Sequence, residues 1–161
     1  IVESLVPFER ELSVLAARGR QGEIACYPVS ENTHREGILR LSVSRPGDPV
    51  QGQAERYLVR LLEHFDYVGV LALELFQVGG RLLANEFAPR VHNSGHWTIE
   101  GGETSQFENH LRAVLGLGLG ATAPIGQAAM LNCIGAMPAA EQVGVLVAVN
   151  AGLFDRLGLE Q

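Results

Sequence analysis

Cysteine is scarce in this sequence, with only Cys26 and Cys133 among 161 residues. The two are far apart and do not have the close spacing of a metal-binding pair. A reduced compartment is therefore favoured over a disulfide framework, and we expect that compartment to be the cytoplasm. No uninterrupted apolar stretch approaches about 18 residues, so the sequence predicts no membrane-spanning helix.

Positive charge is also limited, because 12 Lys and Arg residues face 18 Asp and Glu residues, for a formal net charge of -6. An acidic balance argues against nonspecific binding to nucleic acid or to an anionic membrane. A single well-placed arginine can still bind a phosphate group. A chain of 161 residues can bury a core as one domain, or as one lobe with an appendage.

Hydrophobic patterning predicts a mixture of strands and helices. Residues 11–18 and 22–29 are strand-like and are joined by a glycine-containing turn, and residues 38–44 form a third strand candidate. Helical spacing of apolar residues predicts a helix over residues 50–65. Strands and helices do not alternate strictly, which favours an α+β fold with an antiparallel sheet covered by helices.

The carboxy-terminal half predicts further elements. Ser105 and Glu108 have the spacing of a capping box at the start of a second helix. Residues 128–134 form a strand candidate that opens a small further domain, and residues 142–157 form a helix candidate. The apolar residues expected to face inward from the second helix are Phe107, Leu111, Val114 and Leu115.

Glu74 lies within residues 70–76, an otherwise apolar run that predicts a buried strand. Two adjacent glycines soon after this strand indicate a hairpin. A loop of residues 79–81 places Glu74 directly opposite Glu86, with Cβ atoms roughly 5 Å apart. Two carboxylates so placed repel each other, so either one of them holds a proton or a cation lies between them.

Magnesium is the cation that suits this pair. Mg²⁺ commonly takes one or two carboxylates and completes its coordination shell with water and substrate phosphates. The amide of Asn85 adds another oxygen beside Glu86. Two alternatives stay open, since Glu74 can pair with an arginine, or a different strand register can separate the two acids.

Residues 85–96 hold a carboxylate, a guanidinium, two imidazoles and two amides between glycine and proline, a density typical of a functional site. His92 and His96 are four residues apart, as in a helical zinc site. Pro89 and Gly95 disfavour a helix that presents both, and no H-E-x-x-H pattern occurs, so a zinc hydrolase is disfavoured.

These residues resemble the 5-(carboxyamino)imidazole ribonucleotide synthase family, which comprises ATP-grasp enzymes of purine biosynthesis. The resemblance covers residues 1–138. Segment 2–13 is similar to the part that contacts adenine and ribose in the family. The resemblance is carried by Glu74 and by residues 2–13, 27–40, 85–98 and 105–113.

The resemblance implies the second lobe of an ATP-grasp domain over residues 1–118, followed by the beginning of a carboxy-terminal domain over residues 119–161. In the family, an amino-terminal domain and a first lobe carry phosphate-facing lysines, which have no counterpart in this sequence. We therefore expect an incomplete chain that needs this amino-terminal part for activity. Members of the family commonly form dimers, so a homodimer is also expected.

The implied reaction is the ATP-dependent carboxylation of 5-aminoimidazole ribonucleotide with bicarbonate. In this family ATP activates bicarbonate as carboxyphosphate, and a carboxyl equivalent then passes to the exocyclic amine. The resemblance implies that Glu74 and Glu86 bind Mg²⁺. It also implies that Arg90, His92 and Asn93 are catalytic, with Arg90 able to bind bicarbonate or carboxyphosphate through two parallel hydrogen bonds.

The resemblance also implies a set of nucleotide contacts. Without it, carboxylates such as Glu3 and Glu11 would be interpreted as solvated charges at strand ends. The alternative function is a non-catalytic ATP-grasp lobe that acts as a partner or regulatory subunit. The implied nucleotide-binding residues are Glu3, Ser4, Leu5, Val6, Glu11, His34, Asn85 and Glu86.

Overall fold

A computed structural model of the chain describes residues 4–133. Residues up to 131 belong to one compact unit, and a second unit begins at Asn132. Glu3 and the helix expected at residues 142–157 lie outside the described residues, as does most of the expected carboxy-terminal domain.

The first unit is built on one antiparallel sheet. Its strands follow the order β6-β5-β1-β3-β4-β7, and β2 also pairs with β1. Their bounds are β1 Arg10–Arg18, β2 Ile24–Cys26, β3 Ser30–Arg35, β4 Ile38–Ser44, β5 Gly69–Val78, β6 Arg81–Ala88 and β7 Ala129–Leu131. The helical elements are α1 Gln51–His64, the 3-10 turn η1 Asn93–Gly95, α2 Thr98–Gly101 and α3 Gln106–Leu115.

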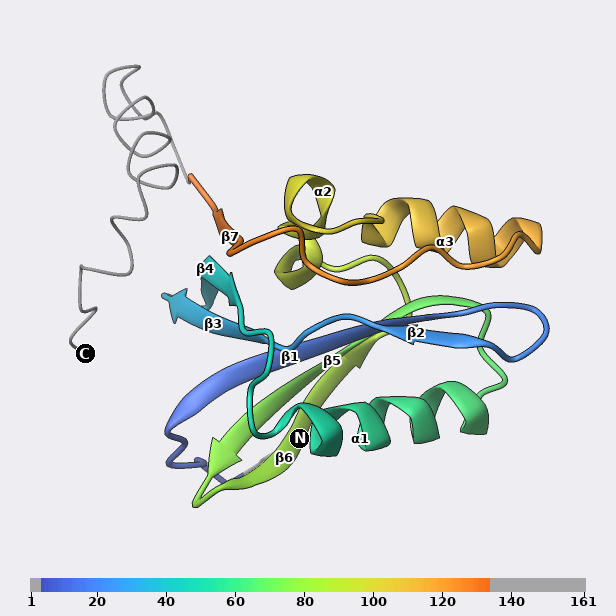
Figure 1. Ribbon diagram of the computed structural model, residues 1–161. Coiled ribbons are helices and arrows are strands. Elements are labelled where there is room, and N and C mark those ends of the chain that lie inside the picture. The colour runs from blue at the N-terminus through green and yellow to red at the C-terminus, as the bar shows by residue number, and fades with distance from the viewer. Residues whose placement is uncertain (1–3, 134–161) are drawn as a thin grey trace, which may run out of the picture. The chain divides into compact units, whose positions relative to one another are not determined.

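The sheet separates two layers of helix, which confirms the α+β prediction. Helix α1 covers one face, whereas η1, α2 and α3 cover the other (Figure 1). Successive side chains of a strand point to opposite faces. In β1, accordingly, Val14 packs in the cluster that contains Leu58 of α1, and Leu15 packs in the cluster that contains Trp97. The second face also carries the polar residues of the site.

The strand predicted over residues 22–29 is in fact interrupted. Strand β2 pairs with the end of β1, residues 27–29 around Pro28 belong to no strand, and β3 then pairs with the beginning of β1. Proline cannot donate to a strand ladder, which accounts for the break. Strand β3 escaped prediction because its residues, Ser30 to Arg35, are all polar.

Helix α3 begins as predicted, because the Ser105 hydroxyl accepts a hydrogen bond from the Glu108 N–H at 3.1 Å. The predicted inward face is wrong. The side chains buried under α3 are those of Gln106, Asn109 and Ala113. The expected core residues are instead exposed, at 38% for Phe107, 60% for Leu111, 40% for Val114 and 66% for Leu115.

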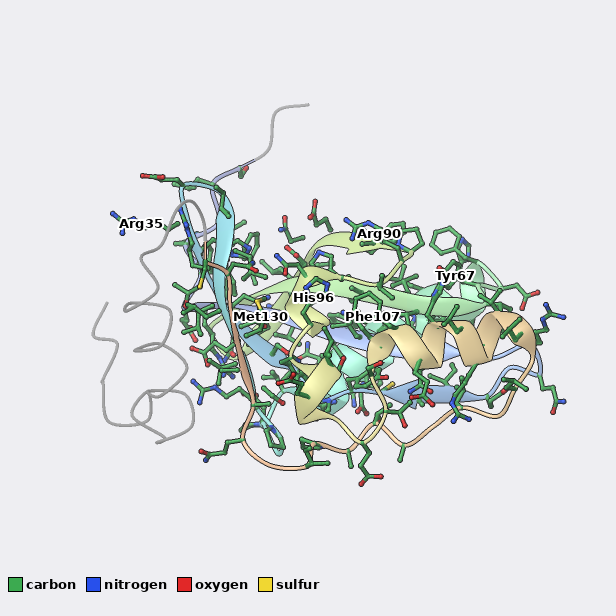
Figure 2. All side chains as sticks on the ribbon, turned by 90° about the horizontal axis from the view of Figure 1, so that it is seen from above. Arg35, Tyr67, Arg90, His96, Phe107 and Met130 are labelled. Atoms are coloured by element: carbon green, nitrogen blue, oxygen red, sulfur yellow. The ribbon has the colours of Figure 1, made fainter. Side chains whose placement is uncertain are left out.

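The reversal has a physical reason, since the buried amides of α3 satisfy backbone groups of the loops beneath the helix. Asn109 pairs with the backbone of Gly120 through both its oxygen and its nitrogen, at 2.8 and 3.2 Å. Phe107 turns outward and stacks on His96, with ring centroids 5.4 Å apart (Figure 2). Polar groups that must be paired therefore decide which face is buried.

Replacing Leu111 with alanine is accordingly expected to change the free energy of unfolding by no more than about 0.5 kcal/mol, as is usual for exposed positions. Urea denaturation followed by circular dichroism measures this. A loss of about 2 kcal/mol or more, as for a buried leucine, would show that Leu111 is covered in solution.

The strand expected at residues 128–134 is present as β7. It pairs with β4, with Leu131 opposite Leu41, and so extends the main sheet. The domain boundary at residues 118 and 119 stays a prediction. None of the helices in the described part of the chain combines the length and apolar character needed to cross a bilayer.

Candidate functional site

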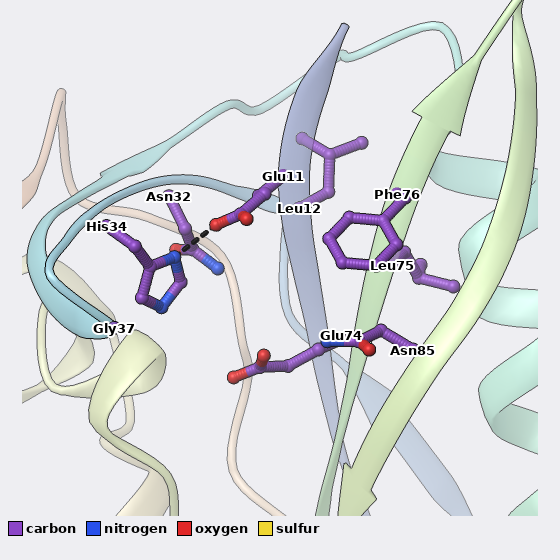
Figure 3. Close-up of a pocket in the computed structure, with 9 residues that line it drawn as sticks. All are labelled: Glu11, Leu12, Asn32, His34, Gly37, Glu74, Leu75, Phe76 and Asn85. Carbon is purple, nitrogen blue, oxygen red and sulfur yellow. Dashed lines mark hydrogen bonds and ion pairs between the residues drawn. The ribbon is translucent and has the colours of Figure 1, made fainter. Parts of the chain in front are cut away.

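The polar residues of the site lie on the sheet face opposite α1. In the ladder, Glu11 of β1 lies between Phe76 of β5 and Asn32 of β3, and Ser13 lies opposite Glu74. Side chains two residues apart on a strand share one face. Glu11 and Glu74 therefore project to the same side from neighbouring strands (Figure 3).

A pocket of about 210 Å³ opens on this face. Its lining comes from four adjacent strands, β6, β5, β1 and β3, and from the turn between β3 and β4. Carboxylate, imidazole and amide groups share the lining with an aromatic ring (Figure 3). The lining residues are Glu11, Leu12, Asn32, His34, Gly37, Glu74, Leu75, Phe76 and Asn85.

The hairpin between β5 and β6 positions the acidic pair. Its loop is Gly79 and Gly80, with φ of 55° and 74°, so the predicted loop of residues 79–81 is wrong by one residue. Two consecutive positive φ angles are the conformation that glycine adopts readily in tight hairpins. By itself this turn would place Glu74 opposite Asn85.

A β-bulge then alters the pairing. Leu75 pairs with Ala84 whereas Leu73 pairs with Phe87, so two residues of β6, Asn85 and Glu86, oppose Glu74 alone. Bulges redirect side chains beside functional sites. Glu86 is therefore brought to Glu74 by the bulge, and not by the three-residue loop that the spacing predicted.

The Glu74 carboxylate is poorly solvated, because its side chain is only 17% exposed. Burial raises its pKa, and the nearby charges of Glu86 and Glu11 raise it further, whereas His34 and Arg90 act in the opposite direction. A cation held by Glu74 and Glu86 would relieve both the burial and the repulsion. The oxygen donor set fits Mg²⁺, which needs only one or two carboxylates when substrate phosphates complete its shell.

Metals that need more protein ligands fit less well. Among residues 4–133, no group of three or more His, Cys, Asp or Glu side chains is arranged to hold a metal ion. His92 is extended, with φ of -131° and ψ of 150°, and precedes the 3-10 turn Asn93–Gly95, so His92 and His96 do not lie on one α-helix.

His92 lies against Glu74, with Nε2 3.3 Å from the Glu74 Oε1. Its Nδ1 faces the Ser94 backbone nitrogen at 3.4 Å and the Ser94 hydroxyl at 2.9 Å. Since a backbone N–H can only donate, Nδ1 is the acceptor and Nε2 carries the proton toward Glu74. Burial lowers the pKa of His92 and Arg90 lowers it further, which favours the neutral ring.

His34 and Glu11 form a second imidazole–carboxylate pair at the other end of the pocket. The His34 Nδ1 contacts the Glu11 Oε2 across the β1–β3 ladder (Figure 3). Both side chains are mostly buried, at 27% and 21% exposure. The resemblance implies that both residues contact the nucleotide, which stays a prediction.

Arg90 and Asn93 stand at the border of this site. Arg90 is exposed, and its Nη1 donates to the Val91 carbonyl at 3.0 Å. Its positive charge lowers the pKa of both Glu74 and His92. Asn93 is half-buried as the first residue of η1. The catalytic roles of both residues stay predictions.

The segment that the resemblance implies for adenine binding does not line the pocket. Ser4, Leu5 and Val6 precede β1 and do not belong to its lining, and the Leu5 side chain is 96% exposed. Glu3 lies outside the described residues. Asn85, by contrast, does line the pocket.

Several residues of this region were not predicted as site residues. Asn32 is buried, and its amide bridges the hydroxyls of Ser13 and Ser42 at 3.1 and 2.8 Å. Phe76 adds an apolar wall, and its ring stacks on that of Phe8 with centroids 4.7 Å apart. The alternation of Ser30, Asn32 and His34 along one strand was the available signal.

Comparisons with known proteins agree with this geometry. A family model described as ATP-grasp domain matches residues 1–107. The chain is 62% identical over 143 residues to the N5-carboxyaminoimidazole ribonucleotide synthase of Pseudomonas aeruginosa, covering 89% of the chain and 40% of that protein. The chain therefore spans about two fifths of the length of the curated relatives it matches.

Solved structures show the same similarity. The N5-carboxyaminoimidazole ribonucleotide synthetase of Thermus thermophilus superposes with a TM-score of 0.84 at 64% identity, over 89% of the chain and 41% of that structure. The synthase of Aspergillus clavatus, in complex with ADP and 5-aminoimidazole ribonucleotide, superposes with a TM-score of 0.77 at 32% identity, over 89% and 40%.

The resemblance predicted from the sequence is thus confirmed, and so is the ATP-grasp architecture. The match covers strands β1 to β6, which hold Glu11, Glu74 and Glu86, together with the loop that carries His92. The chain belongs to the ATP-grasp domain family, and its similarity is to that family's N5-carboxyaminoimidazole ribonucleotide synthases.

Proposed function

We propose that this chain supplies part of an enzyme that carboxylates 5-aminoimidazole ribonucleotide in purine biosynthesis. The enzyme would use ATP and bicarbonate and would release 5-(carboxyamino)imidazole ribonucleotide, ADP and phosphate. The observation that carries the proposal is the clustering of Glu11, Glu74, Glu86 and His92 on one sheet face. This cluster occurs in a chain with high identity to synthases of that name.

The acidic end of the pocket is assigned to the nucleotide. Glu74 and Glu86 would hold Mg²⁺, which when bound neutralises phosphate oxygens during phosphoryl transfer. Glu11 and His34 offer a hydrogen-bonding pair to the ribose. The volume of about 210 Å³ is below the roughly 300 Å³ of ordinary ligand pockets. This supports a site that another part of the full-length enzyme completes.

The loop after β6 is assigned to bicarbonate and the ribonucleotide. Arg90 presents an exposed guanidinium whose planar donors match a carboxylate or phosphate by two parallel hydrogen bonds. The Nε2 proton of His92 can be donated to an oxygen that gains negative charge, and the amide of Asn93 can orient the same group. Phosphate leaves the carboxyphosphate carbon as the exocyclic amine nitrogen forms its new bond there and releases a proton.

Complementation tests this function. The amino-terminal part of a relative is expressed as a separate polypeptide and mixed with the chain, and release of ADP is measured. We expect release that requires both 5-aminoimidazole ribonucleotide and bicarbonate. In the same mixture, Arg90→Ala should lower the rate by roughly a hundredfold or more, the usual effect of removing a charge-stabilising group. Substrate-independent release, or an unchanged rate with Arg90→Ala, would contradict the proposal.

The alternative is a non-catalytic lobe that acts as a partner or regulatory subunit. It predicts a folded chain that binds another protein but supports no carboxylation with any amino-terminal half. The expected homodimer and the cytoplasmic location belong to the main proposal. The oligomeric state is measured by analytical ultracentrifugation of the chain with and without the complementing half.

A further inference from the structure

Gln106 is fully buried at the first position of α3, and its carboxamide faces the backbone of His92. The Gln106 Oε1 accepts a hydrogen bond from the His92 N–H at 2.8 Å, and its Nε2 donates to the His92 carbonyl at 2.7 Å. His92 is extended, with φ of -131° and ψ of 150°. A residue in that conformation exchanges both bonds with one partner in an antiparallel ladder. The carboxamide thus takes the place of a neighbouring strand.

The carboxamide is itself held in one orientation. The backbone N–H of Gln106 donates to the Thr98 hydroxyl at 2.9 Å, which anchors the start of α3, and that hydroxyl donates to the Gly95 carbonyl at 2.7 Å. A Cβ at Gly95 would lie 2.9 Å from the Gln106 Oε1, so the backbone of η1 packs directly against the amide. Because His92 offers one donor and one acceptor, a flipped amide would leave both unpaired.

The fixed backbone of His92 sets the direction in which its imidazole ring points. The ring is held at Nδ1 by Ser94 and points Nε2 toward Glu74. The two Gln106 bonds act on the atoms on either side of the His92 Cα, so they set the direction of the Cα–Cβ bond. A small displacement there would move Nε2 away from Glu74, and catalytic groups tolerate only about 0.5 Å of such error.

We propose that Gln106 is a positioning residue, which acts through the backbone of His92 to aim the imidazole at Glu74 and the substrate. Gln106 itself is not among the residues that line the pocket, and its carboxamide bonds to the His92 backbone. The proposal rests on the proposed function, in which His92 acts on the carboxyl intermediate. It adds a residue outside the pocket on which the geometry of the site depends.

The test is the tautomer of His92 in the chain labelled with ¹⁵N-histidine, measured by NMR at about pH 8, where an unperturbed imidazole is neutral. In the unaltered chain we expect one tautomer, with Nε2 protonated and Nδ1 free of a proton. Gln106→Met keeps the length of the side chain but removes both hydrogen bonds. We expect its His92 signals to move toward averaged tautomers, and its His92 amide to exchange at least about tenfold faster.

Asn109→Leu provides the matched control. Asn109 is also a fully buried amide of α3, but it donates to Tyr27 and to Gly120 and does not contact His92. This variant should lose stability and keep the His92 tautomer. Equal changes at His92 in both variants would overturn the proposal, because they would indicate general loosening. An unchanged tautomer in Gln106→Met would overturn it as well.

If Gln106→Met does not fold, Gln106→Glu gives the same readouts, because it keeps the acceptor for the His92 N–H and removes the donor to the His92 carbonyl. A single unchanged tautomer in that variant would reject the positioning role. The experiment contains no substrate, so its failure would leave the carboxylation proposal standing. Failure of the complementation assay, in turn, would not alter the result at His92.

Discussion

Glu74→Gln is expected to weaken Mg²⁺-dependent ATP binding by at least about tenfold, the loss typical of a perturbed metal site. The same variant should make the ligand-free chain more stable. Glu74 is buried beside Glu86 and Glu11, and its pKa is raised above the ordinary value of 4.5. A glutamine keeps the shape and the acceptor for His92 but carries no charge, so it removes the cost of an ionised group in this position.

The pH dependence of the free energy of unfolding explains why Glu74→Gln is expected to stabilise the chain. Between pH 4.5 and the raised folded pKa of Glu74, the folded state binds more protons than the unfolded state. Stability therefore falls as pH rises through that interval, and the loss persists at neutral pH. Glu74→Gln should raise the free energy of unfolding at pH 7 by about 0.5–2 kcal/mol, as relief of functional strain often does. The gain should shrink toward zero below pH 4.5.

Two measurements check both halves of this prediction. Urea denaturation of the chain at several pH values gives the stability, and calorimetric titration of the complemented enzyme with ATP, with and without Mg²⁺, gives the affinity. Glu86→Gln is the matched control, because Glu86 is exposed and should change stability by only about 0.5 kcal/mol while also weakening binding. Unchanged ATP affinity in both variants would reject the metal site.

Asp48→Ala is expected to lower the free energy of unfolding by about 3 kcal/mol, the cost of removing one partner of a buried ion pair. The Asp48 side chain is only 5% exposed and binds the Arg10 guanidinium through both oxygens, at 2.8 and 3.0 Å. It also accepts the Val50 N–H at 3.0 Å, where α1 begins. Loss of the carboxylate leaves Arg10, beside Glu11 in β1, with the more exposed Glu31, 3.3 Å from its Nη1, as its remaining ionic partner.

The pH dependence of unfolding in acid gives an independent test of the contribution of Asp48 to stability. Burial opposes its ionised form, but the hydrogen bonds from Arg10 and Val50 outweigh burial and lower its pKa below 3.8. The contribution of Asp48 is therefore present above pH 3.8 and is lost as pH falls through the lowered folded value. Unfolding of Asp48→Ala should depend less on pH in this acidic range than unfolding of the unaltered chain.

The control for Asp48 is a neighbouring pair with greater exposure. The Arg45 Nε lies 3.2 Å from the Glu31 Oε2, with side-chain exposures of 46% and 33%. Arg45→Ala should cost at most about 1 kcal/mol, because solvent screens such pairs. A loss below 1 kcal/mol for Asp48→Ala as well would show that the buried geometry does not hold in solution.

Local patterns predicted those elements whose own residues specify them. The helix expected at residues 50–65 is α1, and the strand expected at 38–44 is β4 with the same bounds. Periodic apolar residues and turn glycines act over a few residues, so they are visible without neighbours. Ser105 likewise caps α3 as its spacing with Glu108 predicted.

Patterns failed where burial was decided by partners distant in the chain. The apolar residues of α3 face outward because Gln106 and Asn109 satisfy backbone groups at His92 and Gly120. The polar strand β3 pairs on both sides despite its composition, because its face contributes Asn32 and His34 to the pocket. Local rules often fail at functional sites for this reason.

The sequence alone was enough to identify the ATP-grasp family, because Glu74 and the segment 85–96 carry recognisable residues in recognisable spacing. Only the tertiary structure decided that a bulge brings Glu86 to Glu74, that His92 donates toward Glu74, and that Gln106 holds His92 in place. These arrangements depend on hydrogen bonds between residues far apart in the chain, and spacing along the chain does not specify such partners.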